Sequence, residues 1–171
     1  MASPAPATQG PLARFWRDRR GTALVEFAIS LPLVLVIFAT IVESGRTLFA
    51  YQAAIAGVRD ASRYLGRAAP LDICDPVAAV QSLAGFSARV TQIVTYGADG
   101  NSVLPGHVTV DSVVAEHLCE PGDFRVSRVP VARVTATVSI ALPFAGLFTL
   151  VGGTIPDITT EITDTSRIFG I

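Results

Sequence analysis

The sequence predicts an α+β protein in which one long N-terminal helix packs against a small antiparallel sheet. An apolar run from Thr22 to Val42 continues into steps of three and four residues to about Gly66, as on one face of a helix. Later segments alternate apolar and polar residues with period two, between turn-forming residues. Half of the residues are hydrophobic and 16% are charged. Because soluble domains have about 25% charged residues, the apolar excess indicates a membrane.

Four consecutive segments follow from this pattern. Residues 1–21 form a cytoplasmic leader that is rich in Ala, Pro, Ser and Thr at its start and lacks a hydrophobic period. Residues 22–42 form the transmembrane half of the helix, and residues 43–68 form its outer half. Residues 69–171 form an exported α+β head domain.

The apolar run 22–42 has the length of a membrane anchor. As a helix it spans about 31 Å, which is enough for a hydrocarbon core of about 30 Å. Arginines precede it and are expected to stay in the cytoplasm; they are Arg14, Arg17, Arg19 and Arg20. A cleaved secretory signal and a buried core helix are the alternatives. The run exceeds the length of a signal peptide's apolar region and lacks a small-x-small site before Glu43, so we expect a retained anchor.

Glu26 places a carboxylate inside this membrane-length run, where a charge is costly and needs a partner. If the chain were cut after Gly21, Thr22 would carry a new α-ammonium group. That group could pair with Glu26 of the same chain or of a neighbour packed alongside. Desolvation offsets most of the attraction, so the pair's main value would be to fix axial register. The alternative is a carboxylate that snorkels to the membrane interface.

The motif around Glu26 resembles a type IV prepilin cleavage site. Gly21 is followed by four residues and then by Glu26-Phe27 and an apolar run. The wider stretch from Arg19 to Pro32 resembles the TadE-like family of tight-adherence (Flp) pilus assembly proteins. So do two later stretches, Glu43-Ser44-Gly45-Arg46 and Ala61-Ser62-Arg63.

One departure from the pilus family narrows the resemblance. Major Flp pilins usually have Glu-Tyr and end soon after the helix, whereas this chain has Glu26-Phe27 and a large C-terminal domain. The resemblance therefore implies a minor pseudopilin with a pilin-like fold, rather than the main fibre subunit.

The resemblance also implies roles for particular residues. A membrane prepilin peptidase would cut between Gly21 and Thr22, where only a tiny side chain fits before the cut. Its recognition would involve Arg19, Arg20, Gly21 and Glu26. Assembly and register would involve Thr22, Glu26 and Phe27. The implied partners are the peptidase, other pilin and pseudopilin subunits, the inner-membrane assembly platform and the lipid bilayer.

The function implied is to initiate, cap or regulate a fibre used in adhesion or secretion. The chain would cross the bacterial inner membrane once, with its N-terminus in the cytoplasm and its head periplasmic or extracellular. Two other interpretations stay open: an uncut, signal-anchored exported binding domain, and a pseudopilin of a type II secretion system. An exported enzyme would need a catalytic constellation, and the sequence shows no recognisable one. We therefore expect no catalysis and no cofactor.

In the outer half of the helix, the predicted core face consists of Leu48, Tyr51, Ile55, Val58, Ser62 and Leu65. Beyond Gly66–Pro70, which end the helix, the pattern predicts a short helix over 75–88. It predicts strands over 89–96, 108–118, 132–142 and 158–168. The apolar stretch 144–151 is too short to cross a membrane, and we expect it to be a buried connection.

Cys74 and Cys119 are the two cysteines, and in an exported domain they suggest one disulfide. Two buried free thiols are the alternative. His107 and His117 could join the cysteines in a zinc site, but their spacing matches no strong zinc pattern, so we expect no metal. The net charge of −1 provides no overall basic field for nucleic acid.

Overall fold

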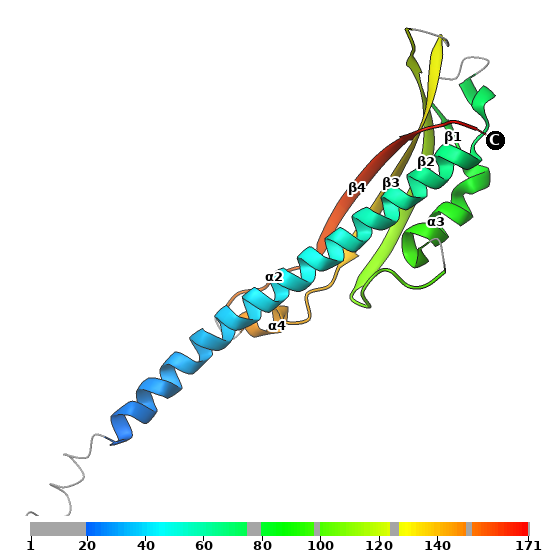
Figure 1. Cartoon of the computed structure of the whole chain (residues 1–171). Coiled ribbons are helices and arrows are strands. Elements are labelled where there is room, and N and C mark those ends of the chain that lie inside the picture. The colour runs from blue at the N-terminus through cyan, green and yellow to red at the C-terminus, as the bar shows by residue number, and fades with distance from the viewer. Residues whose placement is uncertain (1–19, 75–79, 98–99, 124–126, 150–151, 171) are drawn as a thin grey trace, which may run out of the picture. The chain divides into compact units, whose positions relative to one another are not determined.

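The computed structural model describes residues 20–74, 80–97, 100–123, 127–149 and 152–170. The chain divides into two compact units, residues 1–40 and residues 41–171. Figure 1 shows the helices and strands with the labels used here.

The long helix α2 runs from Arg20 to Ala68 and continues through Pro32. Its bounds confirm the predicted helix from Thr22 to about Gly66. Within the described part of the chain it is the one helix that is long and apolar enough to cross a membrane. Only 6% of its most apolar 18-residue window is buried. The core helix of a soluble protein would be mostly buried, so the low value argues against that alternative, and the helix could serve as a membrane anchor.

The second unit contains a four-stranded antiparallel sheet in the order β1-β2-β3-β4. Its strands are β1 (Val80–Ser82), β2 (Val108–Pro121), β3 (Arg128–Ile140) and β4 (Ile158–Arg167). The predicted strands over 108–118, 132–142 and 158–168 are therefore confirmed, as is the α+β class. The register between β2 and β3 shifts at Asp111, where β2 has one extra residue.

One face of this sheet forms the core with α2. Alternate residues of β3 are buried: Ala132, Val134, Ala136, Val138 and Ile140. On α2 the buried positions are mostly small: Ala50, Ala54, Val58, Ala61 and Leu65. The predicted core face was therefore wrong at Leu48 and Tyr51, which are exposed. Small side chains let the helix approach its neighbours closely, which explains why the alanines are inside.

Gly57 shows how close that approach is. A Cβ atom at this position would lie 2.7 Å from the carbonyl oxygen of Val94. Val94 belongs to helix α3 (Ser87–Tyr96), which buries Val90, Ile93 and Val94 in the same core. Gly57 is therefore required for contact between the two helices.

The prediction of a strand over 89–96 was wrong, because this segment is helix α3. The positions of Val90, Ile93 and Val94 fit a helical period, with their side chains on one buried face. The predicted helix over 75–88 was also wrong. Residues 75–79 lie outside the described residues, and the rest forms β1, the 3-10 helix η2 (Ala84–Phe86) and the first turn of α3.

The apolar segment 144–151 contains the short helix α4 (Ala145–Phe148). Phe144 and Phe148 are half-buried, while Gly146 and Thr149 are exposed. Residues 150–151 lie outside the described residues. The expectation of a buried connection was therefore wrong for Phe144, Phe148 and Thr149, because none of these three side chains is fully buried.

Cys74 and Cys119 lie at bonded distance, as predicted. Their sulfur atoms are 2.09 Å apart and their Cα atoms 5.7 Å apart. Cys74 ends the 3-10 helix η1 (Leu71–Cys74), and Cys119 lies in β2. The bond therefore fastens the segment that follows α2 to the central part of the sheet.

Replacing both cysteines with serine is expected to lower the free energy of unfolding by roughly 4 kcal/mol, because the bond closes a loop of sequence separation 45. Urea unfolding of the full chain in detergent, with and without reductant, measures this. Reductant should destabilise the native chain to the level of the double variant and leave that variant unchanged. Equal stability of the two chains under oxidising conditions would contradict the prediction.

Candidate functional site

The predicted cleavage motif lies on the first turns of α2, in the first unit. Arg20 begins the helix, and Arg19 lies outside the described residues. Gly21 is exposed, and a Cβ atom added there would meet nothing within 4 Å. A larger side chain at Gly21 therefore has room within this chain. Any requirement for glycine at this position must come from a partner.

Thr22 and Glu26 lie four residues apart on α2, so they share one face of the helix with Cβ atoms about 6 Å apart. Both are exposed, as is Phe27. No hydrogen bond or ion pair joins Glu26 to another described residue of the chain. The helix thus presents a carboxylate outward from an otherwise apolar surface, within reach of the residue that cleavage would make the N-terminus.

The other polar groups near this run bond to the helix itself. The Ser30 hydroxyl donates to the Phe27 carbonyl at 3.2 Å, and the Thr40 hydroxyl donates to the Val36 carbonyl at 2.8 Å. Such bonds let a hydroxyl enter an apolar environment at little cost. Glu26 is different, because its carboxylate has no such internal partner among the described residues.

The second stretch of the resemblance, Glu43-Ser44-Gly45-Arg46, begins the second unit. Glu43 is only 7% exposed, and its Oε2 atom has no hydrogen bond to a described residue. The Arg46 guanidinium lies 3.4 Å from Nδ1 of His107 and 6.0 Å from the ring centroid of Phe144. Helix, loop and α4 segment therefore meet at Arg46. His107 and Phe144 could not be assigned to this contact from sequence, since they lie far along the chain.

The third stretch, Ala61-Ser62-Arg63, has a structural role at its centre. Ser62 is fully buried, and its hydroxyl donates to the Asp164 carboxylate at 2.5 Å. The carbonyl oxygen of Arg59 lies 2.9 Å from the same hydroxyl. The bond between Ser62 and Asp164 joins α2 to strand β4. Arg63 beside it is exposed, so the stretch combines a buried anchor with a surface charge.

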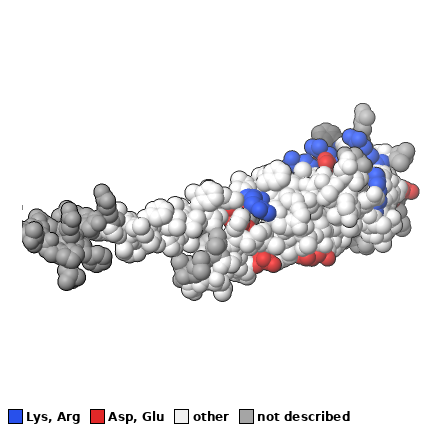
Figure 2. All heavy atoms as spheres, turned by 90° about the horizontal axis from the view of Figure 1, so that it is seen from below, with Lys and Arg blue, Asp and Glu red and all other residues white. Residues whose placement is uncertain are grey.

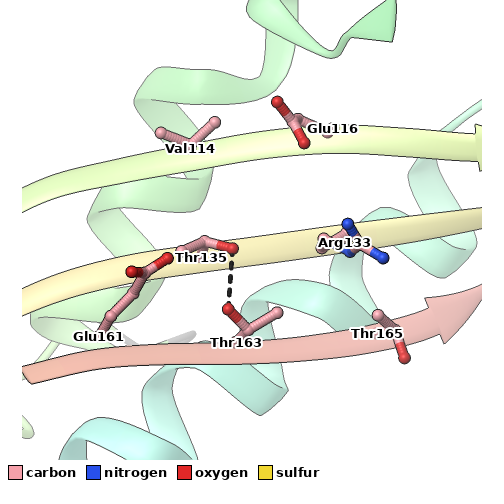
Figure 3. Close-up of a pocket in the computed structure, with 7 residues that line it drawn as sticks. All are labelled: Val114, Glu116, Arg133, Thr135, Glu161, Thr163 and Thr165. Atoms are coloured by element: carbon pink, nitrogen blue, oxygen red, sulfur yellow. Dashed lines mark hydrogen bonds between the residues drawn. The ribbon is translucent and has the colours of Figure 1, made fainter. Parts of the chain in front are cut away.

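The outer face of the sheet is polar and open. A hollow of about 470 Å³ lies on it. The residues that line it are Val114, Glu116, Arg133, Thr135, Glu161, Thr163 and Thr165 (Figure 3). The Thr135 and Thr163 hydroxyls lie 3.0 Å apart in neighbouring strands. Neither the motif nor the composition predicted this hollow. The period-two alternation of β3 signalled only that one face is solvated.

Large apolar side chains are exposed on the part of α2 that belongs to the second unit. Ile41 is 65% exposed, Leu48 60% and Phe49 67%. The residues between Arg46 and Arg59 are all uncharged. A helix surface of this kind is typical of one that packs against another apolar element.

Cys74 and Cys119 are bonded to each other, so neither can supply a thiolate to a metal. His107 contacts Arg46, and His117 is fully buried in β2. The structure does not bring both histidines and both cysteines together as four ligands.

Comparison with known proteins adds one match. Residues 21–63 match the family of TadE-like proteins. The matched segment begins at Gly21 and includes Glu26, Glu43 and Arg46, so the resemblance seen in the sequence is confirmed for this segment. No curated protein and no solved structure matches the chain.

Proposed function

We propose that this chain is a minor pseudopilin of a tight-adherence (Flp) pilus system, because its residues 21–63 match the TadE-like family. A prepilin peptidase removes residues 1–21, and the mature chain starts at Thr22. The N-terminal helix then packs laterally with other pilin or pseudopilin subunits at the inner membrane. Its work is assembly and not catalysis.

The observation that carries the proposal is the position of the match. It starts at the residue before the predicted cut and covers the anchor and most of the outer helix. A family defined by its head would match elsewhere. The shared property is therefore the helix with Gly21 and Glu26, which are the residues that processing and lateral packing would use.

Two features of the helix support lateral packing. Glu26 lacks a partner among the described residues, so an α-ammonium group at Thr22 of a neighbour can pair with it. Ile41, Leu48 and Phe49 remain exposed on α2, and burial against a neighbour would remove this apolar surface from water. A single-pass orientation, with the leader in the cytoplasm and the head outside, follows from the arginines before the anchor.

N-terminal sequencing of the native protein extracted from membranes tests the proposal. A chain that starts at Thr22 is the expected result. A start at Met1 or Ala2, in a host with active prepilin peptidase, would contradict it and leave an uncut anchored domain. If the mature chain starts at Thr22 but co-purifies with components of a type II secretion system, this result would favour the alternative of a type II secretion pseudopilin.

A further inference from the structure

The second unit has two opposite sides of different charge. Helices α2 and α3 cover one face of the sheet, and the other face is open. On the helix side, Arg59, Arg63 and Arg67 are exposed at spacings of four residues on α2, with Asp60 as the one acidic residue among them. Figure 2 shows most of the blue atoms along one edge of this unit and red groups along the opposite edge, with some blue and red atoms between them.

The arginines on α2 form a continuous stripe, which we define as Arg59, Arg63 and Arg67. At 1.5 Å per residue the stripe is about 12 Å long. None of its guanidinium groups bonds to another side chain in the described ranges of the chain. These three exposed positive charges lie on one helix face and are not bonded within the described part of the chain. They can therefore bind an acidic surface outside this chain.

The open face of the sheet is acidic on balance, since the strand register places Glu116, Glu120 and Glu161 on it together with Arg133 and Arg167. Glu116 lies opposite Arg133, which lies opposite Thr165; four residues along β3, Thr137 lies opposite Glu161. The rows that contain Glu116 and Glu161 are therefore about 13 Å apart along the strands.

Asp111 adds an exposed carboxylate beside the Glu161 row and accepts a hydrogen bond from the Ser139 hydroxyl at 2.6 Å, while Glu116 is half-buried. Arg133 is the one basic residue that lines the hollow.

The hollow between these carboxylates suits an arginine side chain. Its walls include Val114 and the methyl groups of threonines, which can cover the aliphatic stem of an arginine. Glu116 and Glu161 can then each accept paired hydrogen bonds from a different guanidinium group, a geometry that arginine favours. In Figure 3 the seven lining side chains come from β2, β3 and β4, so all three strands contribute to the hollow.

We propose that the helix side of one copy docks on the open sheet face of the next copy, with the arginine stripe (Arg59, Arg63, Arg67) against Glu116, Glu161 and Asp111. The stripe and the acidic rows have similar length, and α2 runs along the strands (Figure 1), so the two surfaces can align. The contact joins different surfaces of identical chains. Such head-to-tail contacts produce rings or open helical filaments. The inference rests on the proposed function, because it gives the lateral assembly a contact between head domains.

Charge exchange tests this contact. Two differently tagged copies of the full chain are expressed together and extracted in a non-ionic detergent, and co-recovery of the tags is measured. Arg59→Glu/Arg63→Glu in both copies is expected to reduce co-recovery about tenfold, since like charges would face each other. Asp111→Arg/Glu161→Arg should have the same effect. A chain with all four substitutions should recover most of the native association.

The matched control is Arg89→Glu/Arg128→Glu, which changes the net charge equally at two exposed arginines outside the stripe. It should leave co-recovery unchanged. Native association should also weaken in about 1 M salt, where the Debye length is about 3 Å. Thermal unfolding of every variant checks that the head remains folded.

Two results would overturn the contact. If neither double variant lowers co-recovery, the copies associate through other surfaces. If the helix variant alone loses partners and the fourfold variant does not rescue it, the stripe binds a different acidic molecule, such as a nucleic acid or an acidic glycan. N-terminal sequencing of the same preparations separates either failure from a failure of the proposed function: a start at Thr22 would keep the pseudopilin proposal and reject only the head contact.

Discussion

Replacing Gly21 with leucine is expected to abolish removal of the leader, so that the membrane-extracted chain keeps Met1 or Ala2 as its first residue. Under the proposed function a prepilin peptidase would have to reach the bond after Gly21, and a large side chain at this position would prevent its approach. The structure makes the test sharp, because a Cβ at Gly21 meets nothing within 4 Å in the chain itself. N-terminal sequencing and the apparent mass in gels measure the result.

Gly45 provides a matched control for this prediction. It also lies on α2, is exposed, and has nothing within 4 Å of an added Cβ. Gly45→Leu should therefore insert and be cut as the native chain is. If Gly21→Leu is cut at the native rate, Gly21 does not occupy a restricted peptidase pocket. If both variants fail to be cut, the loss comes from insertion of the helix and not from the cleavage site.

The long helix and the three long strands could be predicted from the sequence because their patterns extend over many residues. The apolar run and its continuation define α2, and the strict alternation in β3 identifies both its strand and its buried face. The short segment 89–96 was assigned to the wrong class because its β-branched residues favour a strand. The segment forms a helix because it packs against Gly57 of α2 and against β2. This contact cannot be known from local sequence.

The buried face of α2 was predicted correctly at Val58, Ser62 and Leu65, but the prediction was wrong nearer the membrane, where side-chain size was a misleading guide. Large residues such as Leu48 and Tyr51 were expected inside, yet Ala50 and Ala54 are the buried ones. The distance between helix and sheet determines which side chains fit, and that distance depends on the whole fold. The exposure of Leu48 and Tyr51 also has a functional meaning, because exposed apolar side chains on this helix suit contact with other subunits.

The candidate site also has parts that could be predicted from the sequence and parts that could not. The motif from Gly21 to Phe27 is local in sequence, so both its residues and its position on a helix could be predicted. The contact of Arg46 with His107 joins residues 61 positions apart. The acidic hollow on the sheet likewise depends on the register of three strands. Contacts between residues that are distant in sequence can be identified only from the fold, even where a local motif is strong.

Replacing Glu26 with alanine or glutamine is expected to reduce association between copies by at least about tenfold. Although the family resemblance implies that Glu26 takes part in peptidase recognition, we expect both variants still to be cut, because Glu26 lies five residues beyond Gly21. Removal of one partner from a buried ion pair is strongly destabilising, because the other charge is left unpaired in a low-dielectric environment. Here the remaining charge would be the α-ammonium group of Thr22. Glutamine keeps the shape of glutamate and removes its charge, so equal loss in both variants would assign the effect to the charge.

Ser30→Ala is the control for this comparison. Ser30 lies one turn beyond Glu26 in the same apolar run, but its hydroxyl bonds to the Phe27 carbonyl of its own helix. Removal of this hydroxyl changes polarity in the run without leaving a charge unpaired, so association should remain native. If Glu26→Gln associates as the native chain does while Thr22 is its first residue, the carboxylate does not fix register. Lateral packing would then depend on the apolar surface of α2, including Ile41, Leu48 and Phe49.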